Sequence, residues 1–249
     1  MALHWSANVA VLLATPSVAS FVGTVVDRVP HREPIFWCRS QCNSCQQTLA
    51  VRDLVPIASY LALFGSCRFC KTPIPRRYLV AEVSALFLGG ISLAIIGTTN
   101  FIVSLPMAWL LFALAYFDLL HGRLPNLLII ALCGLGFAIA PLVAGSLSDR
   151  VIGAMLGLLV GASIAGLYRM LRGHDGLGGG DVKLFAAVGA WIGWEFIFVV
   201  LLISSVGALL FALATGRITK NATLPFGPFI AAATWAVWCW EISALGGRI

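Results

Sequence analysis

Two aspartates occupy positions where a membrane protein rarely carries charge. Asp118 ends the apolar run 101–117, and Asp181 follows three consecutive glycines at the start of another apolar run. Ionisable groups at membrane depth are costly and face a bundle interior or a water-filled cavity, so they mark functional sites. We therefore take the two carboxyl groups as a candidate catalytic pair.

Two carboxyl groups that share one site suit acid–base hydrolysis. Because neighbouring negative charges repel, such a pair retains a single proton. The ionised member can take a proton from water, while the protonated member can donate to the scissile carbonyl and help to protonate the leaving amine. The pattern predicts an aspartic endopeptidase with Asp118 and Asp181 as its catalytic residues. Intramembrane acids also serve proton relays, so a proton-coupled transporter is the alternative.

A second cluster of reactive groups lies in residues 27–77, which hold five of the seven cysteines. This segment contains two Cys-x-x-Cys pairs separated by 21 residues, formed by Cys42, Cys45, Cys67 and Cys70. Two such hairpins can present four thiolates tetrahedrally, which is typical of a structural zinc site with no open position for water. We predict that the four cysteines bind Zn²⁺, with disulfides, a site without metal or an iron site as alternatives. Cys38 receives no role.

The elements that must position these groups are transmembrane helices. The 249 residues are 60% hydrophobic and 10% charged, whereas a soluble domain carries about 25% charged residues. Because a span needs roughly 20 apolar residues, we predict an all-α polytopic protein with about eight transmembrane helices. Their approximate ranges are 6–26, 78–97, 101–118, 126–145, 151–171, 182–193, 195–215 and 225–245.

The apolar stretch from Val182 to Gly216 is too long for one helix, and we predict a break at residues 193–195. The helix before this break would have about a dozen residues and be roughly 18 Å long at 1.5 Å per residue. That length is short of the ~30 Å hydrocarbon core. We therefore expect Asp181 to lie below the membrane surface, where water reaches it through a cleft.

Lysine and arginine positions orient the predicted bundle. With the amino terminus outside, 14 of the 16 Lys and Arg residues fall in or beside cytosolic segments, at 27–77, 119–125, 172–183 and 216–224. This asymmetry predicts a periplasmic amino terminus, with the cysteine loop and both aspartates on the cytosolic side. The first apolar run has no preceding Lys or Arg, so a cleaved signal peptide is disfavoured. Topology and anionic lipid explain the net charge of +6 without nucleic acid.

Three parts are predicted along the chain: a first transmembrane helix at 1–26, a cytosolic zinc domain at 27–77, and a transmembrane catalytic bundle at 78–249. A loop of ~50 residues with few large apolar side chains cannot build much core, so metal binding is expected to stabilise it. Among other ionisable residues, we expect His121 and His174 to be solvated. Glu82 is expected to be functional or paired with an arginine.

Together these motifs resemble the bacterial type IV prepilin peptidases, which are GxGD aspartic membrane peptidases. The resemblance covers nearly the whole chain and implies the same catalytic aspartates and zinc cysteines. It is carried by Ser20-Phe21 through Arg28-Val29-Pro30, the four-cysteine loop, Arg77-Tyr78-x-x-x-Glu82, Asp118 with Leu124-Pro125-Asn126, Gly178-x-Gly180-Asp181-Val182-Lys183-Leu184, and Pro225-Phe226-Gly227-Pro228.

The resemblance also implies a function in pilus assembly and type II secretion at the bacterial inner membrane. Such enzymes remove the basic leader of prepilins and pseudopilins on the cytosolic side, after a Gly and usually before a Phe. Many members then N-methylate the new amino terminus with S-adenosylmethionine, for which no binding residues are assigned here. Gly23 stands where the family usually has Asn, and Ala19 where it usually has Gly. A presenilin-like enzyme that cuts within the bilayer is a further alternative.

Overall fold

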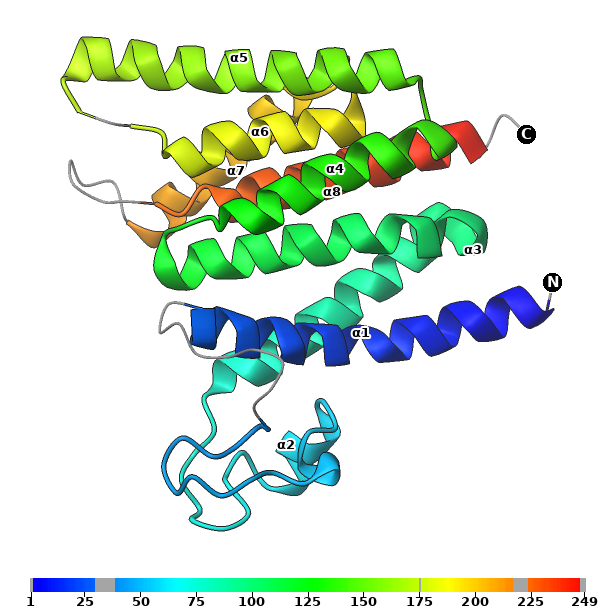
Figure 1. Ribbon diagram of the computed structural model, residues 1–249, viewed down its shortest axis with the longest axis vertical. Coiled ribbons are helices and arrows are strands. Elements are labelled where there is room, and N and C mark those ends of the chain that lie inside the picture. Colours follow the sequence, from blue (N-terminus) through cyan, green and yellow to red (C-terminus); the bar gives the residue numbers. More distant parts are fainter. Residues whose placement is uncertain (1, 30–38, 175, 217–223, 247–249) are drawn as a thin grey trace. The chain divides into compact units, whose positions relative to one another are not determined.

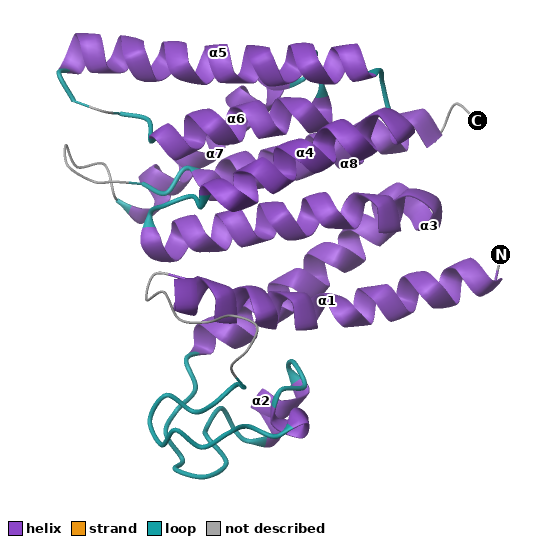
Figure 2. Cartoon of the chain, in the orientation of Figure 1, coloured by secondary structure: helices purple, strands orange, loops and turns teal. Residues whose placement is uncertain are grey.

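The computed structural model is built of helices and describes residues 2–29, 39–174, 176–216 and 224–246 (Figure 1; Figure 2). Its helices are α1 (Ala2–Arg28), η2 (Val51–Asp53), α2 (Ala58–Ala62), α3 (Arg76–His121), α4 (Asn126–Val143), α5 (Leu147–Arg172), α6 (Gly179–Ile192), α7 (Ile197–Thr215) and α8 (Gly227–Gly246). The chain divides into two compact units, Met1–Ala94 (unit 1) and Ile95–Ile249 (unit 2).

The predicted all-α membrane architecture is confirmed. Within the described ranges, six segments are long and apolar enough to cross a membrane: Asn8–Arg28, Arg76–Gly97, Asn100–His121, Asn126–Val143, Leu147–Arg172 and Ile197–Thr215. The helices α6 and α8 occupy the other two predicted ranges without being among these six. With 14 residues, α6 is about 21 Å long at 1.5 Å per residue. This length is too short to cross a ~30 Å hydrocarbon core.

Two glycines with a left-handed φ set the helix boundaries that hydropathy predicts. Gly97 (φ 68°) interrupts α3, so this long helix contains two spans. Gly193 (φ 71°) follows α6, and α7 begins at Ile197. Both positions favour glycine because a side chain strains a left-handed backbone. The predicted break at 193–195 is therefore present.

In unit 1, two acidic side chains join segments that are distant in sequence. Asp27, in the last turn of α1, accepts hydrogen bonds from the Tyr78 hydroxyl and, at 3.1 Å, from the Arg77 guanidinium. Glu82 is buried and accepts a hydrogen bond of 2.7 Å from the backbone N–H of Ile57. Because Ile57 is the N-cap residue of α2, Glu82 fastens the segment between the two cysteine pairs to α3.

In unit 2, α5 and α6 are in direct backbone contact. Gly153, Gly157 and Gly161 are buried at four-residue spacing, so they line one face of α5. A Cβ atom on Gly157 would lie 2.2 Å from the carbonyl oxygen of Phe185, and one on Gly153 would lie 2.5 Å from that of Gly189. Such small-residue stripes let membrane helices approach closely.

The close contact with α5 contributes to the burial of α6. All residues from Leu184 to Ile192 are buried except Ala186. The residues of the first turn of α6 are partly open. The Trp191 indole packs edge-on against Trp238 of α8 and donates a hydrogen bond of 2.7 Å to the carbonyl of Leu132 in α4. A short helix held on several sides is a rigid support for the side chains at its amino-terminal end.

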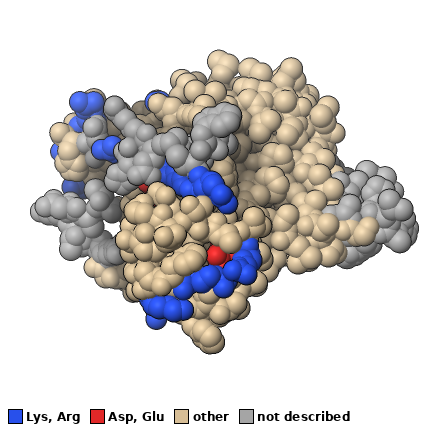
Figure 3. Space-filling view, turned by 60° about the horizontal axis from the view of Figure 1, so that its bottom comes forward, with Lys and Arg blue, Asp and Glu red and all other residues tan. Residues whose placement is uncertain are grey.

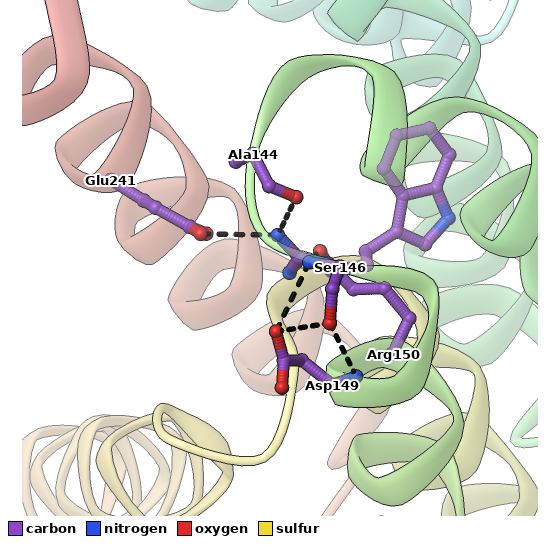
Figure 4. A network of polar contacts seen from close by, with 6 residues as sticks. Ala144, Ser146, Asp149, Arg150 and Glu241 are labelled. Carbon is purple, nitrogen blue, oxygen red and sulfur yellow. Dashed lines mark hydrogen bonds and ion pairs between the residues drawn. The ribbon is translucent and has the colours of Figure 1, made fainter.

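A buried ion pair lies at the carboxy-terminal end of α6. The Arg150 side chain is 2% exposed and donates to the Glu241 carboxylate at 3.2 Å. It also donates to the carbonyl oxygens of Trp191 and Ala144. Figure 4 shows Arg150 between Ala144 and Glu241, beside the Ser146–Asp149 contacts that cap α5. The guanidinium therefore joins α5, α6, α8 and the turn after α4.

Replacing Arg150 with Met is expected to destabilise the protein by about 3–5 kcal/mol, because the change leaves a buried carboxylate without its partner. The double change Arg150→Met with Glu241→Leu should recover part of this loss. Arg172→Met, at the exposed end of the same helix, is the control for loss of charge. Thermal unfolding in one detergent measures all four proteins, and equal stability of the Arg150 and Arg172 variants would contradict the prediction.

Candidate active site and metal centre

Asp118 lies in the last turn of α3 and is buried, with 7% of its surface exposed. Its carboxylate oxygen Oδ2 accepts a hydrogen bond of 2.8 Å from the backbone N–H of Gly227, the first residue of α8. Gly122 (φ 59°) then turns the chain, and α4 begins at Asn126 directly after Pro125. The tight turn from α3 to α4 thus lies next to the carboxyl group.

Asp181 lies in the first turn of α6, where its glycine neighbours permit close approach. Its backbone N–H donates to the carbonyl of Gly178 at 3.0 Å, and a Cβ on Gly178 would lie 3.0 Å from the Asp181 oxygen Oδ2. A Cβ on Gly180 would lie 3.1 Å from that of Leu124. The glycine run therefore leaves space for the carboxyl group and brings α6 against the turn that follows Asp118.

The structure brings both aspartates to one end of unit 2. The Phe226 ring, next to Gly227, packs against Phe185, one turn after Asp181 on α6, with ring centres 6.4 Å apart. Asp181 lies outside the six candidate spans, and burial together with the negative charge of Asp118 raises its pKa. The two carboxyl groups are therefore close enough for their charges to interact. Such a pair is compatible with the acid–base hydrolysis that the sequence predicts, and the catalytic roles of the two residues stay a prediction.

Three neighbouring polar residues take part in other contacts. The Lys183 ammonium donates to the side-chain oxygen of Asn126 at 3.0 Å, which ties the start of α6 to the start of α4. His174 packs edge-on against the Tyr168 ring, and His121 packs against Phe117. Both histidines are exposed, as the sequence analysis expects of solvated residues.

The four cysteines predicted to bind metal are brought together in unit 1. The sulfur atoms of Cys42, Cys45, Cys67 and Cys70 all lie within 4.8 Å of one another. Those of Cys42 and Cys70 are 3.7 Å apart. Four sulfurs held tetrahedrally at 2.3 Å from Zn²⁺ would be ~3.8 Å apart, whereas a disulfide needs ~2.05 Å. The six cysteines in the described ranges are all unbridged; Cys38 lies outside those ranges.

The two cysteine pairs sit on turns with the same backbone hydrogen bonds. The N–H of Cys42 donates to the carbonyl of Gln47 at 3.0 Å, and the N–H of Cys67 donates to that of Thr72 at 2.9 Å. The guanidinium of Arg68, on the second turn, donates at 2.6 Å to the enclosed carboxylate of Asp53, which lies between the two turns in the sequence. This donation lowers the pKa of Asp53. The sulfur cluster thus rests on a folded frame and can hold one metal ion.

Replacing Cys67 with Ser is expected to remove most of the bound metal, because three thiolates leave the tetrahedral set incomplete. Metal analysis of the purified full chain, with Cys133→Ser in α4 as the matched control, measures the effect. The control should keep about one Zn²⁺ per chain, and the Cys67 variant should also become more sensitive to proteolysis in the loop. Unchanged zinc in the Cys67 variant would refute this ligand set.

Comparison with known proteins agrees with this geometry. The bacterial Peptidase A24 N-terminal domain matches residues 13–96, and the type IV leader peptidase family matches residues 105–213. The first match contains the four cysteines and the second contains both aspartates. The chain therefore belongs to the type IV leader peptidase family, and the family prediction is confirmed.

Its relatives include proteins named prepilin leader peptidase/N-methyltransferase. That of Burkholderia pseudomallei (strain K96243) is 39% identical over 211 residues, covering 83% of this chain and 68% of the relative. That of Aeromonas hydrophila is 38% identical over 224 residues, covering 86% and 75%. That of Pseudomonas aeruginosa is 34% identical over 206 residues, covering 81% and 71%. No solved structure matches the chain.

One contact of the candidate site was missed by sequence reasoning. The segment Pro225-Phe226-Gly227-Pro228 carries part of the family resemblance, but its composition gives it no chemical role. In the structure its glycine N–H donates to Asp118, 109 residues earlier in the chain. A glycine between two prolines at a predicted helix start could have indicated a close backbone approach. The carboxyl group that it contacts could not be read from the sequence.

Proposed function

We propose that this protein is an aspartic endopeptidase of the inner membrane that removes the basic leader of type IV prepilins and pseudopilins. The observation that supports the proposal is that Asp118 and Asp181, from the ends of two different helices, are near enough for the charge of one to act on the other. Cleavage after a Gly, on the cytosolic side, is part of the proposal. The family membership and the names of the relatives support this substrate class.

The proposed chemistry needs two carboxyl groups that are partly buried in the protein but accessible to a substrate peptide. Both acids lie at helix ends, so a substrate segment that emerges from the bilayer can reach them without crossing the helix packing. Gly179 adds to this access, because a Cβ there would meet nothing within 4 Å. An open glycine beside a buried carboxyl group leaves room for an extended peptide backbone.

The proposed orientation places this end of unit 2 on the cytosolic side, with the amino terminus of the chain in the periplasm. The turns at the carboxyl pair are flanked by Arg123, Arg172 and Lys183, as the positive-inside rule requires of a cytosolic face. In unit 1, the loop between α1 and α3 is also basic. Figure 3 shows Lys and Arg side chains in groups on the face that it draws, with little acidic surface among them. Both units thus carry basic groups that favour the anionic inner leaflet.

A structural zinc ion and a second activity complete the proposal. Cys42, Cys45, Cys67 and Cys70 would hold the ion, which would supply crosslinking to the loop and leave no position for substrate. The relatives are also named N-methyltransferases, so we include methylation of the new amino terminus from S-adenosylmethionine. The residues that bind this cofactor are not assigned.

The experiment is mass spectrometry of a purified prepilin incubated with the purified full-length protein, with and without S-adenosylmethionine. The proposal expects loss of the leader after the Gly in both cases, and an added methyl group only with the cofactor. A prepilin whose Gly before the cut is replaced by a large residue is the control substrate. An intact prepilin in every reaction, together with proton-driven solute uptake by proteoliposomes, would favour a transporter instead.

A further inference from the structure

We propose that the amino-terminal end of α8 divides the roles of the carboxyl pair, making Asp118 the base that activates water and Asp181 the acid that protonates the scissile carbonyl. Gly227 is the positioning residue, because its N–H donates to Asp118. One oxygen of Asp181, in contrast, has no donor among the described residues. This inference rests on the proposed peptidase function and adds to it an assignment of the two acids.

The first turn of α8 has one N–H group aimed at Asp118. The N–H groups of Phe229 and Ile230 donate within the helix to the carbonyl of Phe226, at 3.1 and 3.2 Å. Pro228 has no N–H to offer. The N–H of Gly227 instead leaves the helix and reaches Asp118 Oδ2 at 2.8 Å. Donation from a positively polarised helix end favours a carboxylate over a carboxylic acid.

Only glycine fits at this helix start. A Cβ on residue 227 would lie 2.9 Å from Asp118 Oδ2 and 3.1 Å from the Asp118 Cβ. Real Cβ contacts are not that short, so any side chain would force the carboxylate away from the N–H. The prolines on either side of the Phe226-Gly227 pair restrict the backbone at this point.

Asp181 has a different environment, although it lies in the first turn of its own helix. Its oxygen Oδ1 is buried and has no hydrogen-bond partner among the residues that the structure describes. Its own backbone N–H, and that of Val182, are used by the carbonyl of Gly178. The backbone of Gly178 donates to the Asp181 carboxyl group, but the second oxygen, Oδ1, is buried without a donor in the described part of the chain. A buried oxygen without a donor disfavours charge, so this member of the pair is the one that keeps the proton.

The assignment gives a balanced reaction. Asp118 takes a proton from water as the water oxygen bonds to the scissile carbonyl carbon, and Asp181 gives its proton to the carbonyl oxygen. As the carbon–nitrogen bond breaks, Asp118 returns its proton to the leaving amine, and Asp181 recovers one from a hydroxyl of the intermediate. One water is consumed, and both acids regain their starting states. The basic groups within three residues of the two acids on their own helices, His121 and Lys183, make the contacts described above, and Arg123 in the turn after α3 is exposed.

The test is the pH dependence of prepilin cleavage by the full chain carrying Gly227→Ala. We expect the rate constant kcat to fall by roughly 10–100-fold, the scale of one hydrogen bond to a charged group. The acid limb of the profile should also move to higher pH, because the base loses its donor. Gly134→Ala in α4, where a Cβ would meet nothing within 4 Å, should leave rate and profile unchanged. A parental profile for the Gly227 variant would overturn the proposal.

A second measurement does not depend on that variant being folded. Infrared titration follows the carboxyl band in the parent, Asp118→Asn and Asp181→Asn. The band that appears at the highest pH should be missing from the Asp181 variant and present in the Asp118 variant, and the opposite result would overturn the assignment. Failure of the parental protein to cleave prepilin would instead refute the proposed function, so the two failures can be told apart.

Discussion

Replacing Asp118 or Asp181 with Asn is expected to abolish leader removal, with a loss on the order of 10⁴-fold or more, the scale on which single catalytic groups act. An amide has nearly the shape of a carboxyl group but can neither take a proton from water nor supply one to a carbonyl. Because a neutral amide costs no more to bury than a carboxyl group, the folded state should not suffer. The measurement is prepilin cleavage by protein extracted from membranes in parental amounts.

The matched control for these variants is Asp149→Asn at the opposite end of unit 2. Asp149 caps α5 through Ser146, and Asn serves as well in such polar contacts, so the control should cleave at the parental rate. Residual cleavage at a parental rate by either the Asp118 or the Asp181 variant would remove that residue from the proposed mechanism. Loss of proton-coupled uptake without any effect on peptides would point to the transporter alternative.

The spans could be predicted because hydropathy depends on composition over about 20 residues. Hydropathy also located the short helix α6, because an apolar run too long for one span must break. Gly193 indicated where the break lies, and in the structure it follows the last residue of α6. The four-cysteine cluster followed from spacing alone, because each Cys-x-x-Cys pair lies on one local turn. These features need no knowledge of which helices touch.

Contacts between distant segments could not be predicted in the same way. Arg150 and Glu241 lie near the ends of predicted spans in the sequence, and nothing there links them, yet they form a buried pair 91 residues apart. Glu82 was expected to act or to pair with an arginine, and in the structure it accepts from the Ile57 backbone. Single-residue chemistry is visible in a sequence, whereas the partner of a buried polar group depends on helix packing.

The glycines of α5 lead to the second large expected effect. In the Gly157→Ala variant, the new Cβ would start 2.2 Å from the Phe185 carbonyl oxygen, whereas carbon–oxygen contacts are about 3.3–3.6 Å. The obstacle is backbone, so α5 and α6 must separate by roughly 1 Å, with a destabilisation of about 1–3 kcal/mol. Because α6 carries Asp181 one turn before Phe185, a shift of this size should also slow cleavage by about 10²-fold.

The control is Gly166→Ala on the same helix, where the new Cβ would meet nothing within 4 Å. It should be neutral or stabilising by up to ~1 kcal/mol, since Ala favours helix over Gly. Thermal unfolding and prepilin cleavage, measured on both variants in one detergent, separate the two effects. If Gly157→Ala matches the control in both, direct backbone contact between α5 and α6 is not what positions Asp181. If it loses stability but cleaves normally, the contact supports the fold without setting the distance between the two carboxyl groups.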